Sequence, residues 1–380
     1  MRKDTMTPKA RMNAVLEGKP VDRLPVTVPY TFLVQDDHWN ELTGLPIEKY
    51  YEWVFSDPDT YVSMHEIFRE KLPFDIFQIR STGNWEKNWE GVRCVKKDNK
   101  LYLYNEKTGQ SKEAPSNPHH LSPPANETQL VYDKDDINRL VKITSAEKLM
   151  ERIHYQYAKK AVERFGKDQF MLIEGILGTF YHCHFYTGLT NLYTLVYDDP
   201  NLMEYLSSKL LEKTVEYIRA YGNIGADAMY IDDAMTTNDM ISVKLYEKFS
   251  MPYISQIVKE IKNHGMKTVI IYFGGVADRI EHIISTGVDA LIMESSMKGF
   301  VNDIESIAQQ IKGRICLYGN IDPVKIIENS CDELLYEEIK KQAEIGKKSG
   351  RFVISTGSPI TPGTPLSRIQ KYIEYARELG

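Results

Sequence analysis

Short, continuously apolar runs recur through the second half of the chain, and each follows a glycine that ends a helical pattern. A glycine at that place closes a helix in the left-handed conformation without steric penalty. The runs lack the alternation of polar and apolar residues that marks a half-exposed strand, so they are typical of parallel strands covered on both faces. The glycines that precede them are Gly225, Gly265, Gly287, Gly313 and Gly350.

Amphipathic helical patterns separate or follow these runs, at 243–264, 276–286, 301–311, 332–348 and 365–379. Strands that alternate with helices in this way indicate βαβ units. Three further candidate strands lie upstream: VTVPY at 26–30, FDIFQIR at 74–80 and FMLIEG at 170–175. Eight strands in all predict an α/β fold, a (β/α)8 barrel of the TIM type. A doubly wound open sheet is the alternative, but no G-x-G-x-x-G sequence follows any strand.

One stretch, at about 84–145, interrupts the alternation of strands and helices. It contains GVRCVKKDNKLYLYN, which predicts a hairpin, and the proline-rich loop APSNPHHLSPPANE. Because barrel strands continue on both sides, we expect an insertion between strands 2 and 3 of a single domain spanning 1–380. Thr7 before Pro8 predicts a capped leading helix over about 7–17.

Composition narrows the class of protein. The 380 residues are 42 % hydrophobic and 26 % charged, with a formal net charge of −6, as in an ordinary soluble enzyme. That charge gives no basic face for nucleic acid. The four cysteines form no C-x-x-C pair and the amino-terminal stretch has no apolar signal region, so a cytoplasmic location is expected. Residues 176–197 lack charged side chains but hold His182, His184 and Asn191, so no membrane span is expected there.

The carboxyl ends of barrel strands carry the chemistry of this fold. Several of these ends hold carboxylates, whereas a single one holds a basic side chain. Carboxylates crowded in a partly dry cavity raise one another's pKa or hold a cation, and either arrangement suits proton transfer or Lewis-acid work. The strand-end residues are Tyr30, Arg80, Glu174, Asp232, Asp233, Tyr272, Phe273, Glu294, Asn320, Asp322 and 355–358. Asp322 precedes a proline and reads equally well as a helix cap.

Two other groups of residues invite a functional interpretation. His182 and His184 are two positions apart, which on a helix turns them away from each other, so we interpret them as core residues rather than metal ligands. Several aromatic side chains could wall a flat pocket, although most read as core. They are Trp39, Trp85, Trp89, Phe180, Tyr181 and Tyr186.

Three segments resemble the uroporphyrinogen decarboxylase (URO-D) superfamily. They are TPKARMNAVLEGKPVDRLPV near the start, LYGNIDP at 317–323 and ISTGSPITPGTP at 354–365, and the resemblance runs from Thr7 to Gly380. The superfamily includes porphyrinogen decarboxylases and corrinoid-dependent methyltransferases, and its fold is a (β/α)8 barrel.

The sequence departs from the decarboxylases at a key place. These enzymes grip their polycarboxylate substrate with an R-Q-A-G-R segment, whereas the corresponding stretch here, PYTFLVQDDHWNELTG, has no arginine. An acidic mouth would repel such a substrate. Asp75 is the match that the resemblance offers for the decarboxylases' catalytic aspartate. The resemblance is therefore nearer to the methyltransferase branch.

The thiol-alkylating methyltransferases of the superfamily bind zinc through H-x-C-G and G-C-G motifs. The matching positions here hold Ile271, Phe273 and Ser358. Isoleucine and phenylalanine cannot ligate zinc, so the usual zinc site is not expected. An oxygen-ligand metal site at Asp232, Asp233 and Glu294 is left open.

The resemblance implies a corrinoid-dependent methyltransferase or demethylase that moves a methyl group between a small methylated substrate and the cobamide of a partner corrinoid protein. We expect an acid to protonate the leaving heteroatom. The candidate catalytic residues are Asp232, Asp233, Glu294 and Tyr272. The candidate substrate-binding residues are Tyr30, Arg80, Trp85, Glu174, Phe273, Asn320 and Ser358. The alternatives are a tetrapyrrole decarboxylase and a non-catalytic tetrapyrrole- or corrinoid-binding protein, and a homodimer is left open.

Overall fold

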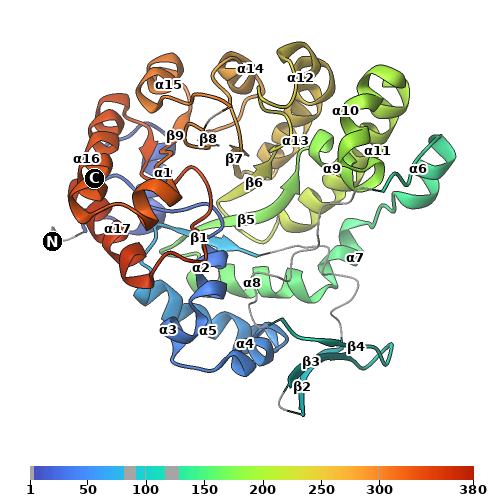
Figure 1. Cartoon of the computed structure of the whole chain (residues 1–380), viewed down its shortest axis with the longest axis horizontal. Coiled ribbons are helices and arrows are strands. Elements are labelled where there is room, and N and C mark those ends of the chain that lie inside the picture. The colour runs from blue at the N-terminus through green and yellow to red at the C-terminus, as the bar shows by residue number, and fades with distance from the viewer. Residues whose placement is uncertain (1–3, 81–90, 99, 116–127, 298) are drawn as a thin grey trace.

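Seven parallel strands form one curled sheet in a computed structural model that describes residues 4–80, 91–98, 100–115, 128–297 and 299–380 (Figure 1). In the order in which they pair, the strands are β1 (Ile76–Ile79), β5 (Phe170–Leu177), β6 (Ala228–Asp232), β7 (Lys267–Tyr272), β8 (Ala290–Met293), β9 (Cys316–Tyr318) and β10 (Phe352–Val353). Sequence order and spatial order agree, as expected for successive βαβ units.

The segment around Val26 closes the ring. Val26 forms a parallel bridge with Ile354, and its carbonyl accepts a hydrogen bond of 2.9 Å from the Asp75 backbone N–H, just before β1. The first predicted strand, 26–30, is reduced to this bridge because Pro29 interrupts it and offers no N–H. The predicted (β/α)8 barrel is confirmed.

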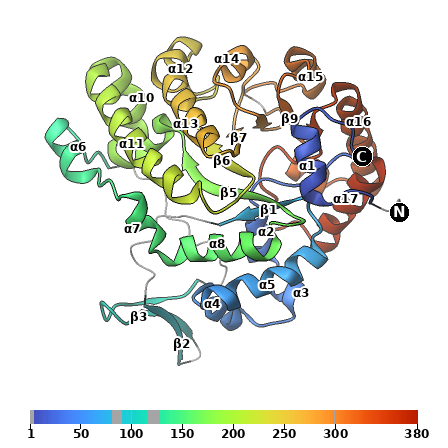
Figure 2. The same ribbon diagram turned by 180° about the vertical axis from the view of Figure 1, so that it is seen from behind.

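Helices surround the sheet on all sides (Figures 1 and 2). They are α1 (Pro8–Leu16), α2 (Thr31–Asp37), α3 (Trp39–Thr43), α4 (Ile47–Val54), α5 (Pro58–Lys71), α6 (Lys134–Leu140), α7 (Ala146–Met150), α8 (Ile153–Phe165), α9 (Thr179–Thr187), α10 (Leu189–Asp198), α11 (Pro200–Tyr221), α12 (Val243–Phe249), α13 (Met251–Asn263), α14 (Ile280–Ser285), α15 (Ile304–Ile311), a π-helix (Pro323–Glu328), α16 (Asp332–Ser349) and α17 (Leu366–Leu379). None of the helices in the described part of the chain combines the length and apolar character that crossing a bilayer requires.

The leading helix α1 covers the amino end of the barrel. Its cap is Thr7, whose hydroxyl accepts a hydrogen bond from the Ala10 backbone N–H. Met12, Val15 and Leu16 pack onto the apolar residues that fill the barrel interior. This end of the barrel is therefore closed, and the opposite end is left for chemistry.

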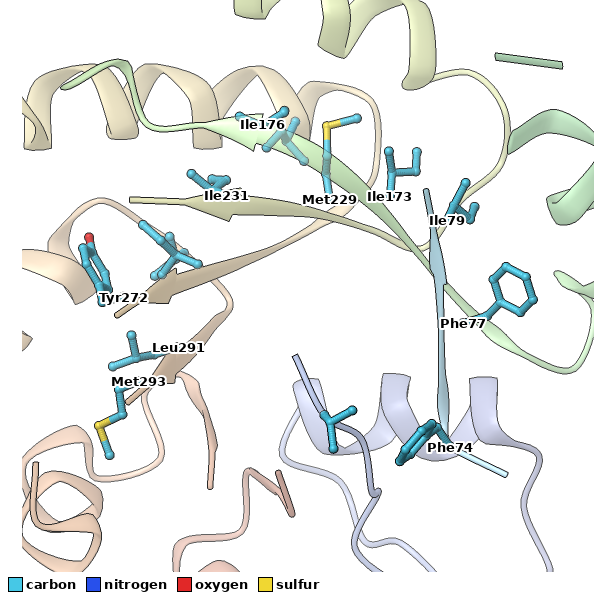
Figure 3. Packing of buried hydrophobic residues seen from close by; sticks show 14 of the residues in the cluster. Phe74, Phe77, Ile79, Ile173, Ile176, Met229, Ile231, Tyr272, Leu291 and Met293 are labelled. Atoms are coloured by element: carbon cyan, nitrogen blue, oxygen red, sulfur yellow. The ribbon is translucent and has the colours of Figure 1, made fainter. Parts of the chain in front are cut away.

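Side chains alternate between two layers along every strand. Leu172, Tyr230, Ile271 and Ile292 fill the interior of the barrel. Their neighbours in sequence pack outward against the helices, as Figure 3 shows for Ile173, Met229, Ile231, Tyr272, Leu291 and Met293. This period of two decides which strand-end residues face the mouth of the barrel.

The insertion between β1 and β5 contains an antiparallel sheet that lies beside α4 (Figure 1). Its strands are β2 (Val92–Lys97), β3 (Lys100–Asn105) and β4 (Ser111–Glu113), and the pair β2–β3 is the predicted hairpin. An ion pair of 3.0 Å between Lys96 and Glu48 joins the sheet to α4. Most of the proline-rich loop lies outside the described residues.

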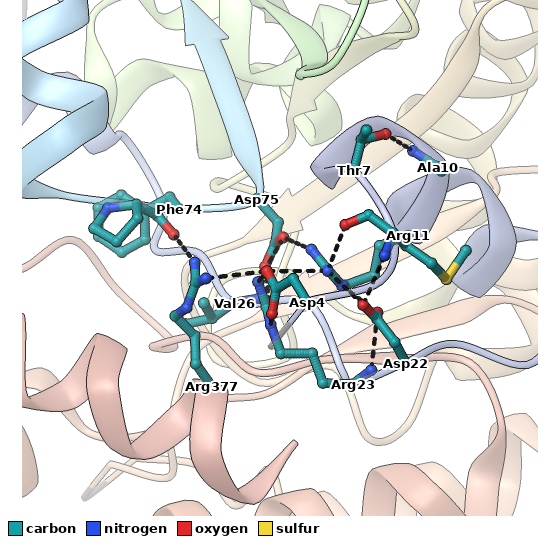
Figure 4. Close-up of polar contacts among 12 residues, drawn as sticks. Asp4, Thr7, Ala10, Arg11, Asp22, Arg23, Val26, Phe74, Asp75 and Arg377 are labelled. Atoms are coloured by element: carbon teal, nitrogen blue, oxygen red, sulfur yellow. Dashed lines mark hydrogen bonds and ion pairs between the residues drawn. The ribbon is translucent and has the colours of Figure 1, made fainter. Parts of the chain in front are cut away.

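A buried network of charges lies at the amino end of the barrel (Figure 4). The Asp75 carboxylate accepts hydrogen bonds from Arg11 (2.5 Å), from Arg23 (2.8 Å) and from the Val26 backbone N–H (2.8 Å). Asp4 bridges Arg23 to Arg377 of α17, at 3.0 Å from each. Because Asp75 directly precedes β1, it lies at the end of the barrel opposite to the mouth. The match to a decarboxylase catalytic aspartate is therefore wrong, and Asp75 is a structural residue.

Candidate active site

The interior-facing residues at the carboxyl ends of the strands form the candidate site. Each lies an even number of positions beyond an interior residue of its own strand, except where a bulge or turn intervenes. The strand ends contribute Arg80, Glu174, Asp232, Phe273, Glu294, Asn320 and Ser358, and the turn after the first strand contributes Tyr30.

A hydrogen bond in the mouth joins Tyr30 to Asp232. The Tyr30 hydroxyl donates to Asp232 Oδ2 at 2.6 Å. Tyr30 has φ 53° and ψ 59°, a left-handed conformation that is rare for a residue with a large side chain. Its ring stacks on Phe273 at 6.0 Å and meets the edge of Tyr230 at 5.6 Å. These contacts hold Tyr30 in the strained backbone conformation that aims its hydroxyl at Asp232.

Burial sets the pKa values of Asp232 and Tyr30. Asp232 is 8 % exposed, and burial raises its pKa to about 6, although hydrogen bonds from Tyr30 and from the Ala234 backbone N–H favour the ionised form. Burial and the neighbouring Asp232 charge raise the pKa of Tyr30 well above its ordinary value. Asp232 therefore gains and loses a proton near neutral pH while Tyr30 keeps its own, which suits general acid–base catalysis.

A second carboxyl group, that of Glu294, lies at the end of β8. The Ser358 hydroxyl donates to Glu294 Oε1 at 2.7 Å. Burial raises the pKa of the Glu294 carboxyl, Ser358 lowers it, and the nearby carboxylates of Asp239 and Asp322 raise it further. Glu294 is a second candidate proton donor.

Glu174 and Arg80 lie on the neighbouring strands β5 and β1. The pairing of β5 with β6 is irregular between Ile173 and Ile176, where Gly175 has φ 111°, and such a bulge re-aims the adjacent side chain. Burial raises the pKa of Glu174 well above its ordinary value, and Arg80 opposes that effect.

Arg80 is engaged by its neighbours. Its guanidinium forms an ion pair with Asp36 and lies 4.3 Å from the ring centre of Phe32. The same carboxylate accepts a hydrogen bond of 3.0 Å from the Tyr50 hydroxyl. The basic residue at this strand end is therefore compensated by a buried acid from α2.

Asp233 and Tyr272 do not face the mouth, so the prediction that they act there is corrected. Asp233 Oδ2 accepts hydrogen bonds from Thr236 (2.6 Å) and Ser250 (2.7 Å), behind the barrel wall. The Tyr272 hydroxyl lies 2.9 Å from that of Tyr246, in the outer layer. Alternation along a strand places the neighbours of an interior residue on the opposite face, and this is the physical reason for the correction.

The Asn320 side chain binds the backbone of the segment that follows β8. Its side-chain amide donates to the Asn302 carbonyl at 2.8 Å and to the Glu294 carbonyl at 3.4 Å. Asp322 caps the π-helix by accepting from the Val324 and Lys325 backbone N–H groups. A substrate-binding role for Asn320 is therefore not supported by its contacts.

Trp85 lies outside the described residues. His182 and His184 lie on the helix α9, and His184 Nδ1 is 2.5 Å from the Tyr181 carbonyl oxygen. Over the described ranges, His, Cys, Asp and Glu form no group of three or more that could hold a metal ion.

The residues at the superfamily's zinc positions do not fit that metal. Ile271 is fully buried in the barrel interior, Phe273 stacks on Tyr30, and Ser358 donates its hydroxyl to Glu294. Two of the three side chains have no donor atom for zinc.

Sequence reasoning missed Asp36, Phe32 and the interior tyrosines Tyr230 and Tyr318. Tyr230 lies two positions before Asp232, and Tyr318 lies two positions before Asn320. A period of two extended backward from each strand end would have found them.

A barrel with buried, hydrogen-bonded acids at the carboxyl ends of its strands has the architecture of the TIM-barrel enzymes. The chain belongs to the uroporphyrinogen decarboxylase (URO-D) family, which it matches over residues 117–379. The resemblance seen in the sequence is confirmed.

Relatives of two kinds accompany this family match. A methylcobamide:CoM methyltransferase, MtbA, of Methanosarcina acetivorans is 24 % identical over 375 residues, which cover 98 % of each chain. A uroporphyrinogen decarboxylase of Coxiella burnetii is 28 % identical over 185 residues, which cover 47 % of this chain and 48 % of that protein. The solved structure of a methyltransferase from Methanosarcina mazei has the same fold, with a TM-score of 0.70 at 17 % identity over 98 % of this chain and 99 % of the other.

Proposed function

We propose that this protein transfers a methyl group between a small methylated substrate and a cobamide carried by a separate corrinoid protein. The observation that carries the proposal is the Tyr30–Asp232 couple, a buried acid with a pKa near neutrality in the barrel mouth. The similarity to a methylcobamide methyltransferase over 98 % of both chains supports it.

Cleavage of a bond between methyl and a heteroatom leaves the bonding electron pair on the heteroatom, which is a poor leaving group unless it is protonated. A reduced cobamide supplies the electron pair that takes up the methyl group. Asp232 holds the required proton on its carboxyl group, and Tyr30 fixes the orientation of that group through its hydrogen bond. Glu294, held by Ser358, is the second acid within the mouth.

The rim of the mouth fits a docking partner. Exposed apolar side chains lie on the loops after β6 and β8 and on the π-helix after β9, although such side chains are normally buried. They are Met240 (49 % exposed), Met297 (55 %), Val301 (67 %) and Val324 (47 %). They offer a cobamide-bearing protein apolar side chains on segments that follow barrel strands.

The charges of the site count against the decarboxylase alternative. A polyanionic tetrapyrrole needs free basic residues, whereas Arg80 is paired with Asp36. The acids Glu174, Asp232 and Glu294 would repel its carboxylates. No step is assigned to zinc, because Ile271 and Phe273 cannot ligate it.

A cytoplasmic location is part of the proposal, supported by four free cysteines, Cys94, Cys183, Cys316 and Cys331. The homodimer stays a prediction.

The test is an anaerobic absorbance assay of the whole protein. Methylcobalamin is offered in one arm, and cob(I)alamin with O-, N- and S-methyl compounds in the other, each with and without a purified corrinoid protein. We expect interconversion of the two cobalamin spectra, lost in Asp232→Asn and weakened in Glu294→Gln. Asp233→Asn is the matched control, because the adjacent carboxyl lies behind the barrel wall. No conversion in any arm contradicts the proposal, and release of carbon dioxide from a carboxylated tetrapyrrole would establish the decarboxylase instead.

A further inference from the structure

Two phenol hydroxyls inside the barrel have no hydrogen-bond partner among the described residues. They belong to Tyr230, which is 2 % exposed, and Tyr318, which is fully buried. A buried hydroxyl that forms no hydrogen bond destabilises the fold, so such groups are rare unless something else binds them. Tyr230 and Tyr318 are called the phenol pair below.

Other deeply buried tyrosines of the chain do have partners. The Tyr50 hydroxyl donates to Asp36 at 3.0 Å, and the Tyr372 hydroxyl donates to the Thr27 carbonyl at 2.8 Å. The Tyr246 hydroxyl lies 2.9 Å from that of Tyr272. Unpartnered phenols are therefore a feature of the barrel interior and not of buried tyrosines in general.

The phenol pair lies directly below the candidate site. Tyr230 is on β6, on the same face as Asp232, and its ring meets that of Tyr30 at 5.6 Å. Burial raises its pKa, Asp232, Glu174 and Tyr318 add to that effect, and the Tyr30 side chain opposes it, so each of these groups lies near Tyr230. Tyr318, on β9, packs in the same interior cluster. Both phenols are therefore neutral hydrogen-bond donors at the bottom of the mouth.

We propose that the phenol pair binds the oxygen atom from which the methyl group is removed, so that the substrate is an O-methyl compound. The inference rests on the proposed function and names its substrate class. After the methyl group leaves, an oxygen atom that has accepted one proton still offers lone pairs to two donors. A departing amine uses its single lone pair for that proton, and sulfur is a weak acceptor.

Removal of the methyl group is balanced in atoms and electrons. The carbon–oxygen bond breaks and its electron pair stays on the oxygen, while the methyl carbon bonds to the electron pair supplied by the reduced cobamide. The oxygen takes the proton of Asp232, which becomes a carboxylate held by Tyr30. The phenol pair donates hydrogen bonds to the developing oxyanion in a water-poor interior, where such bonds act most strongly.

Calorimetric binding to the protein without any cobalamin tests the oxygen site. Phenol is the probe and toluene its matched control, since they differ by the hydroxyl and both suit the aromatic rings of Tyr30 and Phe273. We expect the wild type to prefer phenol, and Tyr230→Phe and Tyr318→Phe each to weaken phenol binding about fivefold while leaving toluene binding unchanged. Tyr246→Phe removes a buried phenol from the outer layer and should leave both affinities unchanged.

The outcomes separate this inference from the proposed function. If phenol binds through the pair but no methyl transfer occurs, the oxygen site stands and the proposed function fails. If methyl transfer occurs and the two variants keep the phenol affinity of the wild type, or the wild type prefers toluene or binds neither probe, the inference is overturned. A change confined to the melting temperature would show that the pair binds only a structural water, which also overturns it.

Discussion

The carboxyl group of Asp233 gives the sharpest quantitative prediction. It is fully buried behind the barrel wall, where Thr236 and Ser250 donate to one oxygen and the other has no partner among the described residues. Asp233→Asn keeps the shape of the side chain and an acceptor oxygen but removes the charge. We expect the variant to be more stable than the wild type at alkaline pH.

Burial raises the pKa of Asp233 from 3.8 to about 7, against the opposing effect of its two hydroxyl donors. Below about pH 4 the group is protonated in both the folded and the unfolded chain, so it does not affect stability. Between about pH 4 and pH 7 the unfolded chain releases its proton first, which favours unfolding, and above about pH 7 the penalty is complete. At about 1.36 kcal/mol per pKa unit, the penalty is about 4 kcal/mol, of which about 3 kcal/mol develops between pH 5 and pH 8.

Urea unfolding of both proteins at pH 5, 6, 7 and 8 measures this effect. The free energy of unfolding of Asp233→Asn minus that of the wild type should grow by about 3 kcal/mol across the series. Asp232 titrates in both proteins, so of its contribution only the charge repulsion with Asp233 remains in the difference. Ser250→Ala removes one donor from the carboxylate and should move the pH dependence of the wild type upward. Parallel pH–stability curves for Asp233→Asn and the wild type would refute the reasoning.

Three further predictions follow from other contacts. Tyr30→Phe removes the hydrogen bond that lowers the pKa of Asp232, so that pKa should rise above about 6. The alkaline limb of the pH–rate profile of methyl transfer should therefore move to higher pH. An unchanged profile would exclude a role of the Tyr30–Asp232 hydrogen bond in catalysis. Asp75→Asn leaves buried arginines without their counter-charge and should lower the free energy of unfolding by about 3–5 kcal/mol in urea titrations. The folded fraction should keep its rate of methyl transfer. A loss of stability below about 1 kcal/mol would contradict a structural role. Gly357→Ala would place a Cβ atom 2.4 Å from a backbone nitrogen and should lower the midpoint of thermal unfolding by several degrees. Gly299→Ala is the control, because open space surrounds its new Cβ atom, and it should leave the midpoint unchanged. Equal midpoints for the two variants would contradict the close packing around Gly357.

The sequence was sufficient to predict the barrel but not to predict which strand-end side chains face its mouth. Continuous apolar runs made the strands visible, and their carboxyl ends gave the height of the site along the barrel axis. The position of a residue along the barrel axis does not tell whether its side chain points into the barrel or outward. For this reason Asp233 and Tyr272 were wrongly expected at the mouth. The contact of Tyr30 with Asp232 joins residues 202 positions apart, and no local pattern signals such a pair.

The charge network at the amino end of the barrel also constrains how the chain is made. Asp4 and Arg377 lie 373 positions apart in sequence, and the strand bridge next to them joins Val26 to Ile354. During synthesis Asp75 and its two arginines emerge from the ribosome long before α17 exists. Until β10 arrives, the nascent sheet has two open edges, at Val26 and at β9, which can pair with other chains. Ring closure is thus postponed until β10 has been synthesised, and we expect nascent chains truncated before β10 to depend on chaperones.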